Sequence, residues 1–198
     1  GVISFAFAVL CGIPLIQSGG IPILIIGLIS LICGYAYTAG HYPLAYLGLG
    51  DLFVILFFGL IAVAGTFFLH AGEFSVTALV AGLQVGLLCS VLIAINNLRD
   101  IEGDTRAHKK TLPVRFGKAF ARREIAILVL LPFLLNVFWM SKGFIMAGML
   151  PMALFPMGFK LIGQVYETEP SAKYNEFLGQ AAKLHLLFGL LLSVGFVL

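Results

Sequence analysis

The fold is decided where an apolar run, VTALVAGLQVGLLCSVLIAI (Val76–Ile95), is followed at once by the polar segment NNLRDIEGDTRAHKKTLP (Asn96–Pro113). The polar segment holds two of the three aspartates of the chain, Asp100 and Asp104. Eight of the twelve Lys and Arg residues lie between Arg99 and Arg123. Because the apolar run is long enough to cross a bilayer, the charge cluster is expected at a membrane boundary.

The composition indicates an integral membrane protein. Of the 198 residues, 61% are hydrophobic and 11% charged, and the mean hydropathy is +1.07. Soluble domains carry about 25% charged residues. The net charge of +3 is small, and the basic residues flank apolar segments and lie among carboxylates, which excludes nucleic acid as a partner.

Seven apolar segments have the length and continuity of membrane helices. They are Val2–Ile16, Ile21–Thr38, Leu52–Leu69, Val76–Ile95, Ile125–Met140, Phe144–Ile162 and Gln180–Leu198. Their apolar residues are continuous rather than alternating, so we predict an all-α polytopic transmembrane bundle and no barrel. Gly82 and Gly86 fit the small-xxx-small pattern of close helix contact, although ordinary glycine frequency in membrane helices gives the same spacing.

The connections between these segments alternate between long and short. The long ones are Ala39–Asp51, Asn96–Glu124 and Gly163–Gly179, and the short ones are Gln17–Gly20, His70–Ser75 and Ser141–Gly143. Lys142 is the single Lys or Arg in the short connections. The positive-inside rule therefore predicts that the long connections, and Gly1, are cytoplasmic.

Acidic and amide side chains recur with helical spacing at the end of the Val76 helix. If that helix continues past Ile95, Asn96, Asp100 and Asp104 lie at i, i+4 and i+8 on one face, with Asn97 three residues before Asp100. Carboxylate and amide oxygens are the ligands that Mg²⁺ prefers, completed by water and substrate phosphate oxygens. We therefore predict a magnesium site on Asn97, Asp100 and Asp104.

Basic side chains follow the carboxylates. Lys109, Lys110 and Arg115 suit the neutralisation of a diphosphate group beside a metal ion, and Arg99 lies within the same segment. Asn96, Arg99, Lys110 and Arg115 are therefore candidate substrate-binding residues. The same cations are also typical of an ordinary cytoplasmic loop.

A tyrosine-rich segment, residues 34–51, is expected on the same side of the membrane. We predict that Tyr37, His41, Tyr46 and Asp51 bind the substrate. Aromatic rings in this segment could contact an aromatic substrate, and their faces could also stabilise a cation. An interfacial aromatic belt explains the tyrosines equally well. Asp51 also suits the N-cap of the helix that follows it.

These motifs resemble the second Asp-rich motif of the UbiA superfamily of intramembrane prenyltransferases. The resemblance rests on Asn96–Asp104 and on the following Lys109-Lys110-Thr111-Leu112. The Asn-Asn-x-Arg-Asp form is similar to the branch that prenylates 1,4-dihydroxy-2-naphthoate in menaquinone synthesis. The segment Tyr37–Asp51 and the residues after it resemble that branch too, so the likeness covers essentially the whole chain.

The resemblance implies a nine-helix bundle around a central cavity, of which this chain would supply the last seven helices. Residues 1–198 would then be one membrane-embedded prenyltransferase domain without its N-terminal part. The family's first Asp-rich motif would precede Gly1, in keeping with a chain that does not begin with Met. Two residues depart from the family pattern: His108 stands where the family usually has Gly, and His41 where this branch often has Pro.

The resemblance also implies a reaction. A polyprenyl group would pass from polyprenyl diphosphate to 1,4-dihydroxy-2-naphthoate with loss of diphosphate and carbon dioxide, giving demethylmenaquinone. Asp100, Asp104 and Lys109 would be catalytic, Mg²⁺ the cofactor, and a bacterial cytoplasmic membrane the location. Other aromatic acceptors, such as 4-hydroxybenzoate or homogentisate, stay open. An ion-coupled transporter is the alternative from another class, although its acidic residues are expected near the middle of helices.

Overall fold

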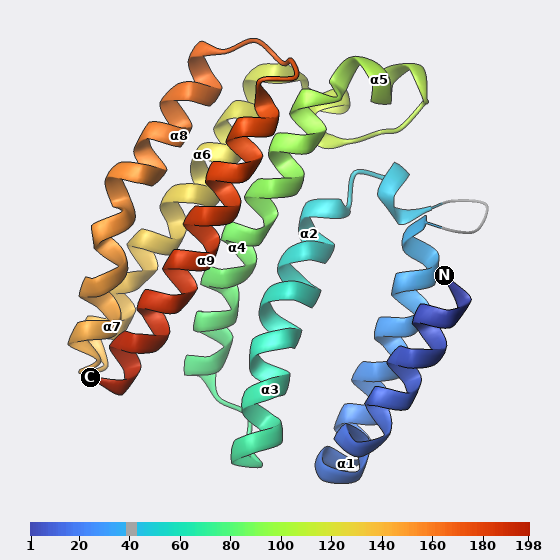
Figure 1. The fold of residues 1–198 in the computed structure, drawn as a ribbon, viewed down its shortest axis with the longest axis vertical. Helices are drawn as coiled ribbons and strands as arrows, with labels where there is room; N and C mark the ends of the chain where they lie inside the picture. Colours follow the sequence, from blue (N-terminus) through green and yellow to red (C-terminus); the bar gives the residue numbers. More distant parts are fainter. Residues whose placement is uncertain (39–42) are drawn as a thin grey trace.

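Every regular element in the described part of the chain, residues 1–38 and 43–198, is helical in the computed structural model (Figure 1). The elements are α1 (Val2–Thr38), η1 (Leu44–Tyr46), α2 (Gly50–Val54), η2 (Ile55–Ile61), α3 (Ala62–Ala71), α4 (Val76–Arg99), α5 (Ile101–Arg106), α6 (Leu112–Ser141), α7 (Ile145–Met149), η3 (Leu150–Leu154), α8 (Phe155–Glu167) and α9 (Tyr174–Val197). Six helical stretches are long and apolar enough to cross a membrane. The all-α, multi-pass membrane architecture predicted from the sequence is confirmed.

The first of these stretches, α1, contains two of the seven predicted helices. Gly20 interrupts it with φ 64° and ψ −149°, a conformation that glycine adopts without steric cost. The chain folds back there, so the two arms of α1 lie side by side (Figure 1). A methyl group at Gly34 would lie 3.6 Å from the ring of Phe5 on the other arm.

The long connections, apart from residues 39–42, which are not described, lie at one end of the bundle and the short ones at the other. Figure 1 shows α5, the link from α8 to α9 and the approach to α2 at the same end. Several predicted loop residues at this end are helical, because α6 begins at Leu112 and α9 at Tyr174. Tyr174 and Phe177 are fully buried, which explains why α9 begins before its continuous apolar run. Gly117, with φ 83°, bends α6 shortly after its start.

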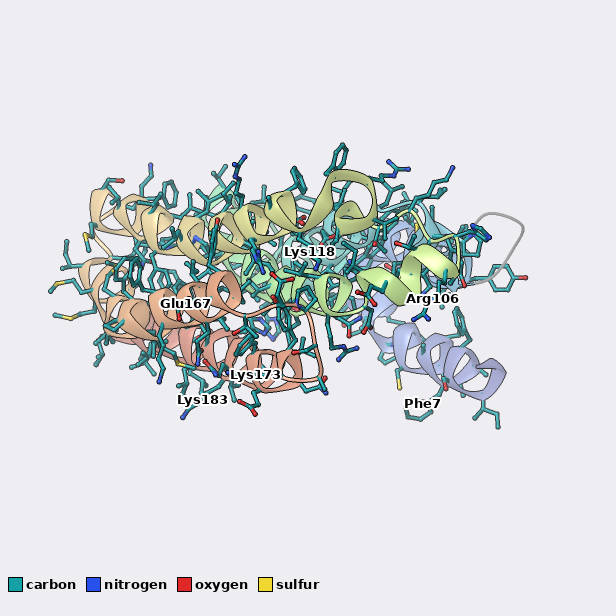
Figure 2. The ribbon with its side chains drawn as sticks, turned by 90° about the horizontal axis from the view of Figure 1, so that it is seen from above. Phe7, Arg106, Lys118, Glu167, Lys173 and Lys183 are labelled. Carbon is teal, nitrogen blue, oxygen red and sulfur yellow. The ribbon has the colours of Figure 1, made fainter. Side chains whose placement is uncertain are left out.

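Helix α4 is the centre of the packed half of the molecule. It contacts η2, α6 and α9, and the side chains of Leu88, Ile95 and Leu98 are fully buried. The α1 hairpin, in contrast, lies at the periphery, where Phe7 points away from the bundle (Figure 2). The polar end of α4 is therefore positioned by the packing of α4 against α6, η2 and α9.

Small residues bring α4 close to the helix formed by α2, η2 and α3. A Cβ atom at Gly82 would lie 2.9 Å from the carbonyl oxygen of Gly59, and one at Gly86 would lie 2.8 Å from that of Ile55. Closer to the C-terminal end of α4, the Ser90 hydroxyl donates to a carboxylate oxygen of Asp51 at 3.4 Å. The segment η2 is π-helical, with wider turns than an α-helix. Gly82 and Gly86 thus form the close helix contact that their spacing indicates.

A buried network of polar side chains joins the middle of α4 to α6. The Gln84 amide donates to the Pro132 carbonyl at 2.8 Å and to the Asn136 amide oxygen at 2.9 Å. The indole of Trp139 donates to Gln84 at 2.7 Å. Polar groups inside a membrane must find partners within the protein. This network therefore fixes α4 against α6.

Candidate active site

The Asp-rich face runs across a junction between two helices. Helix α4 continues past Ile95 as the sequence suggests, but it ends at Arg99, and Asp104 lies on α5. Asp100 at the junction has φ −94° and ψ 10°. Its backbone N–H donates to the Asn96 carbonyl at 3.0 Å, and the Asp104 N–H donates to the Asp100 carbonyl at 2.8 Å. Because i to i−4 bonding passes through the junction, the predicted shared face is kept although the helix is not continuous.

This face lines a polar cavity of about 180 Å³ at the end of the bundle that carries the long connections. The residues that line it come from α1, η1 and the loop after it, the start of α2, α4, α5 and the segment that leads into α6. They are Tyr37, Ala45, Gly48, Gly50, Ile93, Asn96, Asn97, Asp100, Asp104, Lys109 and Thr111. All three predicted metal ligands and all three predicted catalytic residues are among them.

Arg99 holds the carboxylate of Asp100 with two hydrogen bonds. Its Nε donates to one carboxylate oxygen at 2.8 Å and its Nη2 to the other at 2.7 Å. The same guanidinium donates to the amide oxygens of Asn96 at 2.8 Å and of Asn175, on α9, at 2.5 Å. The bond from Arg99 lowers the pKa of Asp100, so this carboxylate stays ionised at neutral pH.

Lys109 neutralises the second carboxylate. Its Nζ lies 3.1 Å from a carboxylate oxygen of Asp104, whose residue is only 6% exposed. The hydrogen bond to Asp104 raises the pKa of Lys109, so the ammonium stays protonated well above neutral pH. The same Nζ lies 5.5 Å from the ring centre of Tyr46, within cation–π range.

The η1 segment covers the cavity. The Lys110 N–H donates to the Tyr46 carbonyl at 2.9 Å, and a side chain at Gly48 would clash with the Lys110 carbonyl oxygen. Gly48 has φ 72°, a second reason for glycine at this position. Thr111, which lies next to Lys110, is 4% exposed.

Five of the predicted substrate-binding residues that the structure describes do not line the cavity. Arg99 meets it only through its bonds to Asn96 and Asp100. Tyr46 and Lys110 pack over it, while Arg115 belongs to the first turn of α6. Asp51 is buried in the first turn of α2, where it accepts from Ser90, and it does not cap that helix. His41 lies outside the described residues.

His108 has φ 55°, and no other non-glycine residue in the described part of the chain has a positive φ. Glycine adopts this left-handed conformation at lower cost than any other residue. The geometry therefore gives a physical reason for the glycine that the resemblance leads one to expect at this position.

Two features of the site were not predicted from the sequence. Asn175 meets Arg99 from 76 residues away, and no local pattern signals this bond. Thr111 lines the cavity, and its local sequence does carry a signal. A capping Thr usually bonds to the N–H of the second or third helical residue, but Pro113 is the second residue of α6 and has no N–H.

The donor set fits the Mg²⁺ that the resemblance implies. Within residues 1–38 and 43–198, no three His, Cys, Asp or Glu side chains gather as a metal site. Mg²⁺, however, is usually held by one or two carboxylates and completed by water and substrate phosphate oxygens. Asp100 and Asp104, with the Asn97 amide on the same cavity, match that requirement. Arg99 and Lys109 balance the two carboxylates in this structure.

Comparisons with known proteins match this chain to one family of prenyltransferases. The model of the UbiA prenyltransferase family matches residues 1–191. The chain is 32% identical over 181 residues to the 1,4-dihydroxy-2-naphthoate octaprenyltransferase of Haemophilus influenzae, which covers 87% of this chain and 56% of that protein. It is 41% identical over 107 residues to the Escherichia coli protein of that name, covering 54% of this chain and 35% of the relative.

A similar relative comes from Homo sapiens. UbiA prenyltransferase domain-containing protein 1 is 30% identical over 164 residues, which covers 83% of this chain and 47% of that protein. The matched part of the chain spans between 35% and 56% of the length of these curated relatives.

Proposed function

The chain belongs to the UbiA prenyltransferase family, and on that premise we propose that its protein transfers a polyprenyl group from polyprenyl diphosphate to 1,4-dihydroxy-2-naphthoate. The relatives named as 1,4-dihydroxy-2-naphthoate octaprenyltransferases support this choice of acceptor. The observation that carries the proposal is the convergence of Asn97, Asp100, Asp104 and Lys109 on one cavity at the polar end of the bundle.

The proposed role of this cavity is to bind the diphosphate and stabilise its departure. Asn97, Asp100 and Asp104 would hold Mg²⁺, which when bound supplies positive charge to the diphosphate oxygens. Lys109 and Arg99 contribute fixed cationic donors beside these carboxylates. Stabilisation of the leaving charge favours breakage of the bond between the allylic carbon and the diphosphate oxygen.

The acceptor then forms the new carbon–carbon bond. The electron-rich ring attacks the allylic cation at its carboxyl-bearing carbon, and carbon dioxide leaves with its bond electrons returning to the ring. The products are diphosphate, carbon dioxide and the quinol whose oxidised form is demethylmenaquinone. The apolar helices exclude water, which would otherwise trap the cation.

The site is proposed to face the cytoplasm. The cavity lies at the end of the bundle that holds the long connections and most of the Lys and Arg residues. Lys142 is the single Lys or Arg in the short connections at the other end. This asymmetry supports a cytoplasmic active site under the positive-inside rule.

The test is a transfer assay with a panel of acceptors. Membranes that contain the full-length protein are incubated with labelled polyprenyl diphosphate, Mg²⁺ and either 1,4-dihydroxy-2-naphthoate, 4-hydroxybenzoate or homogentisate. We expect a labelled, decarboxylated product with 1,4-dihydroxy-2-naphthoate. Product with one of the other acids alone would change the acceptor, and absence of product with all three would refute aromatic prenyl transfer.

A further inference from the structure

Thr111 lines the polar cavity, and its hydroxyl is buried without a hydrogen-bond partner. Thr111 is 4% exposed, and its Oγ1 is one of three buried side-chain N or O atoms in the described residues that have no partner. The other two atoms belong to Asn136 and Gln164, which do not line this cavity. Buried polar groups are almost always bonded, so an unpaired hydroxyl at a polar cavity calls for an explanation.

The local sequence removes one of the usual partners of the Thr111 side chain. Thr111 is the N-cap residue of α6, with φ −60° and ψ 159°, yet its side chain makes no capping hydrogen bond. Pro113 removes one of the two N–H groups that a capping Thr ordinarily bonds.

The surrounding backbone also fixes where Thr111 lies. The preceding residue, Lys110, is bonded through its N–H to the Tyr46 carbonyl. The Thr111 carbonyl accepts from the Arg115 N–H at 3.0 Å. The backbone at Gly48 also packs so closely on the Lys110 carbonyl oxygen that a side chain there would clash. The hydroxyl is therefore held beside the cavity, and a partner is expected from within the cavity.

The chemistry of the cavity indicates what that partner is. Asp104 is paired with Lys109, and both carboxylate oxygens of Asp100 are bonded by Arg99. None of these carboxylate oxygens is bonded to the Thr111 hydroxyl, and an oxygen of a bound diphosphate accepts strongly from a hydroxyl.

We propose that the Thr111 hydroxyl donates a hydrogen bond to a diphosphate oxygen of the prenyl substrate. This inference rests on the proposed function and adds a substrate-binding residue to it. Because the hydroxyl has no partner in the unliganded protein, its removal is expected to weaken ligand binding without weakening the fold.

The test compares isosteric variants of the full-length protein in detergent. Thr111→Val removes the hydroxyl and keeps the shape, while Thr111→Ser keeps the hydroxyl. Thr105→Val is the matched control, because Thr105 lies nearby on α5, is exposed, and bonds to the Ile101 carbonyl at 2.7 Å. The readouts are the dissociation constant for inorganic pyrophosphate with Mg²⁺ by calorimetry, the midpoint of thermal unfolding, and kcat and KM for polyprenyl diphosphate.

We expect Thr111→Val to weaken pyrophosphate binding about tenfold, since hydrogen bonds to charged groups are the stronger class. Its unfolding midpoint should stay unchanged or rise, while Thr111→Ser and Thr105→Val should bind pyrophosphate like the wild type. Wild-type affinity in Thr111→Val would overturn the inference. A fall in its unfolding midpoint together with the affinity would also overturn it, because that result indicates a structural role.

Binding and transfer separate this inference from the proposed function. If the wild-type protein binds pyrophosphate but prenylates no aromatic acid, the proposed reaction fails, and loss of binding in Thr111→Val would still support the diphosphate contact. If the wild-type protein has no affinity for pyrophosphate, both proposals fail.

Discussion

The middle and the C-terminal end of α4 hold their polar side chains in different ways. In the middle, Gln84 makes three hydrogen bonds to α6. At the end, Arg99 and Lys109 pair with the carboxylates of Asp100 and Asp104 beside a cavity. Gln84, in the middle of α4, is fully buried. The end includes Asp104, nearly buried, and Asp100, whose side chain is 41% exposed. Polar groups bonded within the protein fix how helices pack. Ionised carboxylates that line a cavity can in addition bind a ligand.

The largest effect is expected at the end of α4. Asp104→Asn keeps the size of the side chain but removes its charge, so it should lower prenyl transfer roughly a hundredfold or more. Asp100→Asn should act in the same way, as measured with the labelled substrate assay. Glu102→Gln is the matched control, because Glu102 is an exposed carboxylate on α5 outside the cavity. Near-normal transfer in both aspartate variants would remove the basis for the metal assignment.

The next effect concerns packing at the middle of α4. Gly86→Ala places a methyl group 2.8 Å from the Ile55 carbonyl oxygen and 3.0 Å from the Gly59 Cα, so the helices must separate. We expect a loss of about 1–3 kcal/mol in the free energy of unfolding, measured by thermal or denaturant unfolding in detergent. Gly65→Ala is the control, since a methyl group there meets no atom within 4 Å. Equal stability of the two variants would contradict the close contact.

A smaller loss is expected from the buried network. Gln84→Leu leaves the Trp139 indole without an acceptor and should cost about 1–2 kcal/mol of stability. Transfer per folded molecule should not change, because Gln84 lies outside the cavity. Adding Trp139→Phe should cost less in the Gln84→Leu background than in the wild type. Loss of transfer at unchanged stability would mean that the middle of α4 takes part in the chemistry.

The smallest effect is expected at His108. His108→Gly relieves the left-handed conformation and should raise stability by up to about 1 kcal/mol, offset in part by the greater freedom of glycine in the unfolded chain. Prenyl transfer should not change. The measurement is the unfolding midpoint, with Ala107→Gly as the control for added flexibility, since Ala107 has φ −84°. A lower midpoint in His108→Gly than in Ala107→Gly would contradict the strain.

Much of the fold follows from local sequence, and the cavity follows only in part. Continuous apolar runs predict the membrane helices, and four-residue spacing predicts the shared face of Asn96, Asp100 and Asp104. The helix ends are predicted less accurately from the sequence, because burial of Tyr174 and Phe177 extends α9 at its start beyond the apolar run. The bond from Arg99 to Asn175 depends on how α9 packs on α4, which no local pattern encodes.

The π-helical segment η2 also sets a rotational phase. The pairs Asp51–Ser90, Ile55–Gly86 and Gly59–Gly82 advance four residues at a time along both helices. A regular α-helix turns by about 100° per residue, so a four-residue step drifts by about 40°. The wider turns of η2 reduce that drift and keep Asp51, the neighbour of Gly50 in the cavity wall, on the same face as Gly59. Deleting one residue from η2 would rotate one end against the other by about 100°, so a deletion far from the cavity would misalign its wall.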